Sequence, residues 1–151
     1  MKHIIGLIII LLGNFIMTSL RADQCVLALG VGDNLAFSQS AIEVPRSCAE
    51  FTITLSHGGT LPAAVMGHNF VVAKTADLQA IQDEGNKVGP DGGYLKKGDE
   101  RVLVASDIIG GGESVQIVVQ PEWLDSPDEF SFFCTVMSHS VVMKGVIRAT
   151  N

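Results

Sequence analysis

Alternation of apolar and polar residues along most of the chain predicts β-strands. Residues 51–56 are the clearest case, because apolar side chains there alternate with hydroxyl side chains, as in a strand that has one face on a core and the other in water. The same reasoning predicts six further short strands, at 25–30, 69–73, 101–106, 114–119, 129–134 and 144–149. Turn sequences rich in glycine separate these segments, which together indicate an all-β protein.

One segment has helical periodicity instead. Residues 75–84 place Ala, Leu, Gln and Ile at helical spacing, with Thr75 as a candidate N-cap and Gly85 just beyond the expected end. Seven or so short strands with one inserted helix predict an antiparallel Greek-key β-sandwich. Because no repeat or linker interrupts the pattern, residues 23–151 are predicted to be one domain.

Residues 1–22 are predicted to be a secretory signal peptide that is cleaved after Ala22. A basic start at Lys2 precedes an apolar stretch over 4–17, and Leu20-Arg21-Ala22 follows it. The apolar stretch is shorter than the roughly 20 residues of a membrane-spanning helix. We therefore expect a periplasmic protein with no membrane span after cleavage. An uncleaved anchor is the alternative, whereas a lipoprotein is disfavoured because the residues before Cys25 lack a lipobox.

Export changes how the three cysteines are interpreted. In an oxidising compartment, three thiols suggest one disulfide and one cysteine kept for another purpose. Cys25 and Cys48 both lie in the N-terminal third, whereas Cys134 is far away. The first two are therefore predicted to pair.

The charge of the chain excludes one broad class of function. The chain has 151 residues with a net charge of −6, and no run of Lys or Arg occurs in it. Binding to a phosphate backbone requires a basic surface. Nucleic acid is therefore not an expected partner.

The candidate chemistry lies around the last two predicted strands. Cys134, His139 and Met143 place a thiolate, an imidazole and a thioether within ten residues, and His68 supplies a second imidazole upstream. Two imidazoles and a thiolate in a plane, with a weak axial thioether, suit copper in both oxidation states. Sulfur ligands favour Cu(I) and imidazoles accept Cu(II), so this set predicts a copper site.

The same side chains also fit simpler roles or a different metal. Taken singly, Cys134 could be a small buried core residue, His68 an ordinary turn residue and Met143 a residue that fills the core. Zinc also binds Cys and His, but structural zinc prefers four such ligands. Catalytic zinc needs an open position and a nearby carboxylate, and residues 135–142 contain neither Asp nor Glu. Copper is therefore the preferred metal.

Several motifs resemble the azurins, a family of periplasmic blue-copper proteins with the cupredoxin fold. The resemblance extends from Cys25 to the C-terminus. The motifs that carry it are Leu55-Ser56-His57-Gly58-Gly59, Val65-Met66-Gly67-His68-Asn69, Tyr94-Leu95-Lys96, Phe132-Phe133-Cys134-Thr135, His139-Ser140 and Met143-Lys144-Gly145.

The resemblance implies a role for each candidate ligand. His68, Cys134 and His139 would form a trigonal copper plane. Met143 would be the weak axial ligand, and the backbone carbonyl of Gly67 would lie on the opposite side.

The resemblance also implies roles for residues around the metal. Cys25 and Cys48 would form the family's disulfide, and the predicted helix would lie outside the sandwich. Asn69 and Thr135 would hydrogen-bond the two ligand loops together. Redox partners such as c-type cytochromes, oxidases or reductases would bind weakly to an apolar face around His139, formed by Leu35, Leu61, Val65, Met66, Val136, Met137, Val141 and Val142.

The ligand loop departs from the family pattern. Azurins usually carry an aromatic-Pro-Gly sequence where this chain has Val136-Met137-Ser138, and a Trp where it has Phe70. The loop length is unchanged, so the site is expected to be retained with a different reduction potential. Met143 keeps the expected spacing, which disfavours Met137 as a competing ligand.

The predicted function is therefore outer-sphere transfer of single electrons by one copper ion, without enzyme activity. A copper-binding or scavenging protein that has no redox-shuttle role is the alternative. A copper oxidase or nitrite reductase would need further copper centres, whereas residues 23–151 contain only three histidines, His57, His68 and His139.

Overall fold

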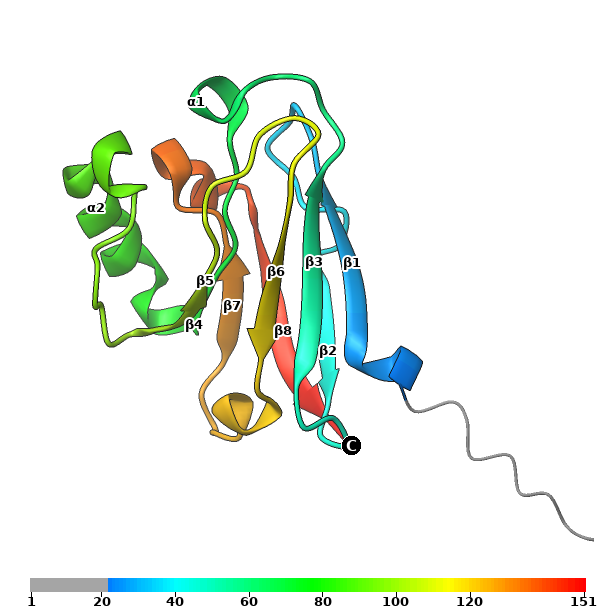
Figure 1. Ribbon diagram of the computed structural model, residues 1–151. Helices are drawn as coiled ribbons and strands as arrows, with labels where there is room; N and C mark the ends of the chain where they lie inside the picture. Colours follow the sequence, from blue (N-terminus) through cyan, green and yellow to red (C-terminus); the bar gives the residue numbers. More distant parts are fainter. Residues whose placement is uncertain (1–21) are drawn as a thin grey trace, which may run out of the picture.

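Two β-sheets packed face to face make up the computed structural model, which describes residues 22–151 (Figure 1). One sheet has the strand order β1-β3-β6 and the other the order β2-β8-β7-β4-β5. The signal peptide predicted over 1–22 lies outside the described residues, apart from its last one. The strands are β1 Val26–Val31, β2 Ala41–Pro45, β3 Phe51–His57, β4 Val71–Lys74, β5 Val102–Ala105, β6 Ser114–Val119, β7 Phe130–Phe133 and β8 Lys144–Thr150.

The predicted sandwich is confirmed, but two strand pairs differ from the antiparallel expectation. β1 pairs with β3 in parallel, and β2 pairs with β8 in parallel, whereas the other pairs are antiparallel. For β1 and β3, the cause is that the chain crosses to the second sheet as β2 and returns to the first as β3. After this passage out and back, β3 runs in the same direction as β1.

The inserted helix is present, with different ends from those predicted. A 3₁₀ turn, η2 (Thr75–Asp77), leads into α2 (Leu78–Val88), which ends at Gly89 with a φ of 69°. Gly85 lies buried inside α2, where a Cβ atom would be 2.2 Å from the carbonyl oxygen of Tyr94. The remaining helical segments are η1 Ala22–Cys25, α1 Ala63–Met66, η3 Pro90–Gly92, η4 Pro121–Leu124 and η5 Val136–Val141.

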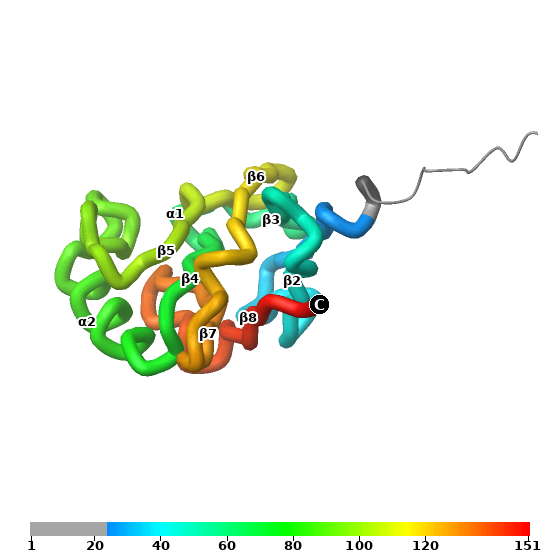
Figure 2. The backbone as a smooth tube through the Cα atoms, turned by 90° about the horizontal axis from the view of Figure 1, so that it is seen from below, coloured from blue at the N-terminus to red at the C-terminus, as the bar shows by residue number. Residues whose placement is uncertain are grey.

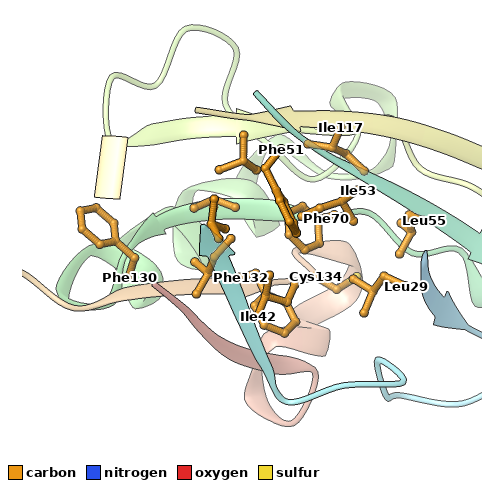
Figure 3. Packing of buried hydrophobic residues seen from close by; sticks show 14 of the residues in the cluster. Leu29, Ile42, Phe51, Ile53, Leu55, Phe70, Ile117, Phe130, Phe132 and Cys134 are labelled. Carbon is orange, nitrogen blue, oxygen red and sulfur yellow. The ribbon is translucent and has the colours of Figure 1, made fainter. Parts of the chain in front are cut away.

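An apolar core fills the space between the two sheets. Figure 3 shows part of it, with side chains from both sheets meeting around Phe70 and Phe132. These two rings stack with their centroids 5.4 Å apart, and Phe37 packs edge-on against both. Cys134 belongs to the same buried cluster, so the candidate metal ligand is part of the main core.

A second apolar cluster attaches α2 to the outer face of the five-stranded sheet. Leu78 and Ile81 of α2 pack there against Val71, Ala73 and Phe133. Figures 1 and 2 both place α2 outside the sandwich. Phe130 and Phe132 of β7 belong to the main core and Phe133 to the second cluster, and all four residues of the strand are buried. The strand that leads into Cys134 is held from both sides.

The predicted disulfide is confirmed between Cys25 and Cys48, with an S–S distance of 2.03 Å. It links η1 to the connection between β2 and β3. In Figure 1 this end of the sandwich is opposite to the end that carries α1. Among the described residues, no helix has the length and apolarity needed to cross a bilayer.

Candidate metal centre

Three side chains of metal-binding type converge at the end of the sandwich near α1. Cys134 Sγ lies 3.8 Å from His68 Nδ1 and 3.6 Å from His139 Nδ1. All three ligand atoms are within 4.8 Å of one another, and all three residues are buried. Within residues 22–151 they are the one group of three or more His, Cys, Asp or Glu side chains that is arranged in this way.

Separate parts of the chain position these ligands. Cys134 directly follows β7, and its backbone N–H donates to the Met143 carbonyl at 3.1 Å. His139 lies in η5, the orange turn after β7 in Figure 1. His68 precedes β4, where its backbone exchanges two hydrogen bonds with Ile109. The site thus joins residues 66 positions apart in the sequence.

Hydrogen bonding selects the form of the His68 ring. Its Nε2 atom lies 2.9 Å from the Gly32 carbonyl oxygen, which can only accept, so Nε2 carries the proton. The lone pair is then on Nδ1, the atom that faces Cys134. This is the arrangement by which proteins orient a metal-binding histidine.

His57 supports this ring without reaching the ligand cluster. The two imidazoles stack with centroids 5.4 Å apart and planes 16° from parallel. His57 Nε2 donates to the Met66 carbonyl at 2.9 Å, and Nδ1 accepts the Gly59 N–H at 3.1 Å. Both ring nitrogens are therefore engaged with the backbone.

Burial sets the charge state of the metal-free site. It lowers the pKa of His68 and of His139, which favours neutral rings that are ready to bind a metal. Burial also raises the pKa of the Cys134 thiol to about 11, although the backbone N–H groups of Asn69 and Val136 act in the opposite direction. The thiol is thus protonated at neutral pH and must release its proton when a metal binds.

The geometry of the donor atoms fits a transition metal. Metal bonds to nitrogen and sulfur are about 2.0 to 2.3 Å long, so three such atoms spread evenly around an ion would lie about 3.5 to 4 Å apart. Both distances from the Cys134 sulfur fall in this range. Two imidazoles and one thiolate are the donors that suit copper in both oxidation states.

Asn69 and Thr135 join the two ligand-bearing loops. Asn69 Nδ2 donates to the Thr135 hydroxyl at 2.8 Å, and the Thr135 backbone N–H donates to Asn69 Oδ1 at 2.9 Å. Both residues are buried, and each directly follows a ligand, His68 or Cys134. These bonds fix the separation of the two loops.

Gly67 and Met143 are neighbours of the ligands. Gly67 precedes His68 in the chain, and Met143 is hydrogen-bonded to Cys134 and His139 through the backbone. Gly67 packs so closely that a Cβ atom would be 2.3 Å from the Ala63 carbonyl oxygen, so a glycine is required there. Met143 is 1% exposed, and its backbone N–H donates to the His139 carbonyl at 2.7 Å. The backbone of Met143 is thus held against that of His139, whereas Gly67 packs against Ala63.

The residues expected to form an apolar docking face share one end of the sandwich but differ in exposure. Leu35, Val65, Met137, Val141 and Val142 are exposed. Leu61 and Met66 are half-buried. Val136 is a correction to the expected face, because it is 2% exposed and packs in the core cluster. His139 is buried, with 7% of its surface exposed.

Comparison with known proteins agrees with this geometry. A family model described as "Copper binding proteins, plastocyanin/azurin family" matches residues 23–150. Azurin of Bordetella pertussis is 42% identical over 127 residues, which are 84% of this chain and 85% of that protein. Azurin of Pseudomonas aeruginosa is 39% identical over 128 residues, or 85% of this chain and 86% of that protein.

This chain belongs to the plastocyanin/azurin family. A solved structure of azurin (Az-iso2) from the obligate methylotroph Methylomonas sp. strain J is similar, with a TM-score of 0.80 and 35% identity. The similarity covers 84% of this chain and 98% of that one. The azurin relatives and the His68, Cys134 and His139 cluster identify a type 1 blue copper protein that carries electrons and is not an enzyme. A role in copper scavenging is not favoured.

Sequence reasoning missed two residues that contact the ligand loop. Gln82 and Asn86 of α2 donate hydrogen bonds to Thr135 and Ser138, respectively. In the sequence Gln82 lies in the helix predicted over 75–84, whereas Asn86 lies beyond the end of that helix. No signal in the sequence placed the two amides on one helix face.

Proposed function

We propose that this protein carries single electrons between redox proteins through a copper ion that His68, Cys134 and His139 would hold, with the Met143 thioether and the Gly67 carbonyl as weaker ligands. The bound ion would supply reversible one-electron chemistry between Cu(I) and Cu(II). The convergence of two imidazole nitrogens and a buried sulfur is the observation that carries the proposal. Backbone bonds from Met143 to Cys134 and His139 support its place beside the ion.

The protein's own contribution is to keep this ligand set fixed. The Gly32 carbonyl orients His68, and the Asn69–Thr135 pair sets the distance between the loops. A site whose ligands are held in place by the fold rearranges little when the charge of the ion changes, which favours rapid electron transfer.

We further propose that redox proteins such as c-type cytochromes dock at the apolar face beside His139. Exposed Val65, Met137, Val141 and Val142 support such a face, since apolar patches of this kind mark contact surfaces. A small face suits weak, short-lived binding. The signal peptide predicted over residues 1–22 and the disulfide support a periplasmic location.

The visible spectrum of the copper-loaded, oxidised protein tests the metal site. We expect an intense absorption of red light from charge transfer between Cys134 and copper, and its loss in Cys134→Ser. Met143→Leu should keep an absorption band but change its position and the reduction potential, as expected of a weak axial ligand. A colourless Cu(II) complex of the wild-type protein would contradict the proposal.

Transfer of electrons from reduced cytochrome c tests the docking face. Val141→Ser should lower the second-order rate several-fold, because an exposed apolar contact is lost. Val118→Ser is the matched control, since Val118 is also exposed but lies in β6, away from η5. Equal rates for both variants would exclude the proposed face.

A further inference from the structure

We propose that helix α2 is a brace for the copper-ligand loop, and that Gln82 and Asn86 are the positioning residues through which it acts. This inference rests on the proposed copper site. The two side chains hold the loop just before and within a bend that its own sequence does not favour.

The bend lies between two of the ligands. Met137 and Ser138 adopt φ angles of 44° and 64°, in the left-handed region that favours glycine. Neither residue is glycine, and Met137 is exposed. Residues in such conformations persist when the surrounding structure fixes them. An external restraint on this loop is therefore required.

α2 contacts the loop both before the bend and within it. Gln82 Nε2 donates to the Thr135 carbonyl at 2.8 Å, in the interior. Asn86 Nδ2 donates to the Ser138 hydroxyl at 2.9 Å. Gln82 Nε2 also donates to Asn86 Oδ1 at 3.0 Å, which connects the two contacts to each other.

The directions of these hydrogen bonds are fixed. Gln82 faces two acceptors, so its amide nitrogen must point toward them, and Asn86 in turn must present its nitrogen to Ser138. Gln82 is 2% exposed, and within the described part of the chain its Oε1 atom has no hydrogen-bond partner. A buried amide with one unpaired atom is unfavourable for stability alone, which fits a residue that serves to position the loop.

α2 is itself firmly seated. Leu78 and Ile81 pack on the sheet beside Phe133, the residue before Cys134. Glu84 pairs with Lys96 at 3.1 Å and with Arg101 at 3.2 Å on the other side of the helix. The helix is therefore fixed relative to the sheet, and its side chains can hold the loop in a fixed position.

Both contacted residues adjoin a ligand. Thr135 follows Cys134, and Ser138 precedes His139. The Thr135 carbonyl is bonded to Gln82, while its N–H and hydroxyl are bonded to Asn69, beside His68. The brace is thus connected to the segments that carry all three ligands.

Two substitutions at one position separate this role from a general loss of stability. Ser138→Ala removes the hydroxyl partner and keeps the unfavourable left-handed residue, whereas Ser138→Gly removes the same hydroxyl but accepts the bend without strain. Asn86→Ala removes the other partner, and the exposure of Asn86 makes unfolding of this variant unexpected. The readouts are the red absorption band and the EPR spectrum of the Cu(II) protein, and amide hydrogen exchange of the metal-free protein.

We expect Asn86→Ala and Ser138→Ala to shift the absorption band and the EPR parameters, and Ser138→Gly to resemble the wild type. In the metal-free protein, exchange at 137–139 should rise about fivefold in the two alanine variants, the factor that corresponds to one neutral hydrogen bond of about 1 kcal/mol. Asn86→Ala combined with Ser138→Gly should restore the wild-type spectrum.

Unchanged spectra and exchange in both alanine variants would overturn the brace, as would an equal shift in Ser138→Gly. These outcomes assume that the wild-type copper protein shows the red band. Its absence in the wild type would instead contradict the proposed function. Failure of the brace and failure of the copper site are therefore distinguishable.

Discussion

Asn69 and Thr135 form a reciprocal pair, in which the side chain of one residue is matched by both the side chain and the backbone of the other. The amide of Asn69 both donates to the Thr135 hydroxyl at 2.8 Å and accepts its backbone N–H at 2.9 Å. Both residues are at most 1% exposed. The pair therefore joins the two ligand-bearing loops, at the end of the sandwich that holds the candidate metal site, by hydrogen bonds that are shielded from water.

Asn69→Ala should lower the free energy of unfolding by roughly 2 to 4 kcal/mol, because it removes two buried hydrogen bonds and leaves the Thr135 N–H unpaired. Urea denaturation of the metal-free protein measures this loss. Thr135→Val is the matched control, since it removes the hydroxyl and keeps the backbone bond. It should cost about 1 kcal/mol, and a cost equal to that of Asn69→Ala would show that the backbone bond contributes nothing.

Replacing both disulfide cysteines should destabilise the fold without altering the metal site. The disulfide closes a loop with a sequence separation of 23 residues. For this length, Cys25→Ala combined with Cys48→Ala should lower the free energy of unfolding by about 3 kcal/mol. The copper absorption band should be unchanged, because the disulfide and the ligands lie at opposite ends of the sandwich (Figure 1). A shifted absorption band in this variant would show that the disulfide does affect the metal site.

Acid should weaken the interaction between Asp99 and Arg101, in the segment between α2 and β5. The Arg101 side chain hydrogen-bonds Asp99 and holds the pKa of that carboxyl below its ordinary value of 3.8. A depressed pKa stabilises the fold above pH 3.8, and this contribution is lost as the pH falls through the folded-state pKa. The difference in unfolding free energy between the wild type and Asp99→Asn should thus be constant near neutral pH and shrink below pH 3.8. A difference that grows in acid would contradict this assignment.

Gly85→Ala should displace α2. Its Cβ atom would lie 2.2 Å from the Tyr94 carbonyl oxygen, and backbone cannot yield as a flexible side chain can. We expect a loss of about 1 to 3 kcal/mol in unfolding free energy, together with a shifted copper absorption band. Ala80→Gly, at an exposed position of the same helix, should cost about 1 kcal/mol through helix propensity alone. The absorption spectrum of Ala80→Gly should match that of the wild type. A shifted band in Ala80→Gly would show that the shift in Gly85→Ala is not specific to displacement of α2.

Most of the fold follows from local pattern. The alternation in 51–56 and 114–119 predicts β3 and β6 because each strand has one buried face. β2 was not predicted, although its burial alternates. It is short and ends at Pro45, a residue that argues against a strand but is tolerated at a sheet edge, where β2 lies. Gly85 was interpreted as a helix end, because the close approach of Tyr94 is a tertiary contact with no local signature.

The ligand set was predicted from the types and spacing of residues in one short loop together with the resemblance to the azurins. Exposure within the apolar face could not be predicted in the same way. Val136 and Met137 are adjacent and both apolar, yet the left-handed bend directs Val136 into the core and leaves Met137 in solvent. The contacts of Gln82 and Asn86 depend on where α2 packs, which local periodicity does not determine.

The hydrogen bond from His68 to Gly32 ties the two sheets together at the metal end. Gly32 follows a strand of the three-stranded sheet, and His68 leads into the five-stranded one. Separating the sheets at this end would break that bond and turn a metal-binding ring away from its partners. Binding of an ion should therefore oppose opening of the sandwich, and a loaded protein should melt at a higher temperature than the empty one.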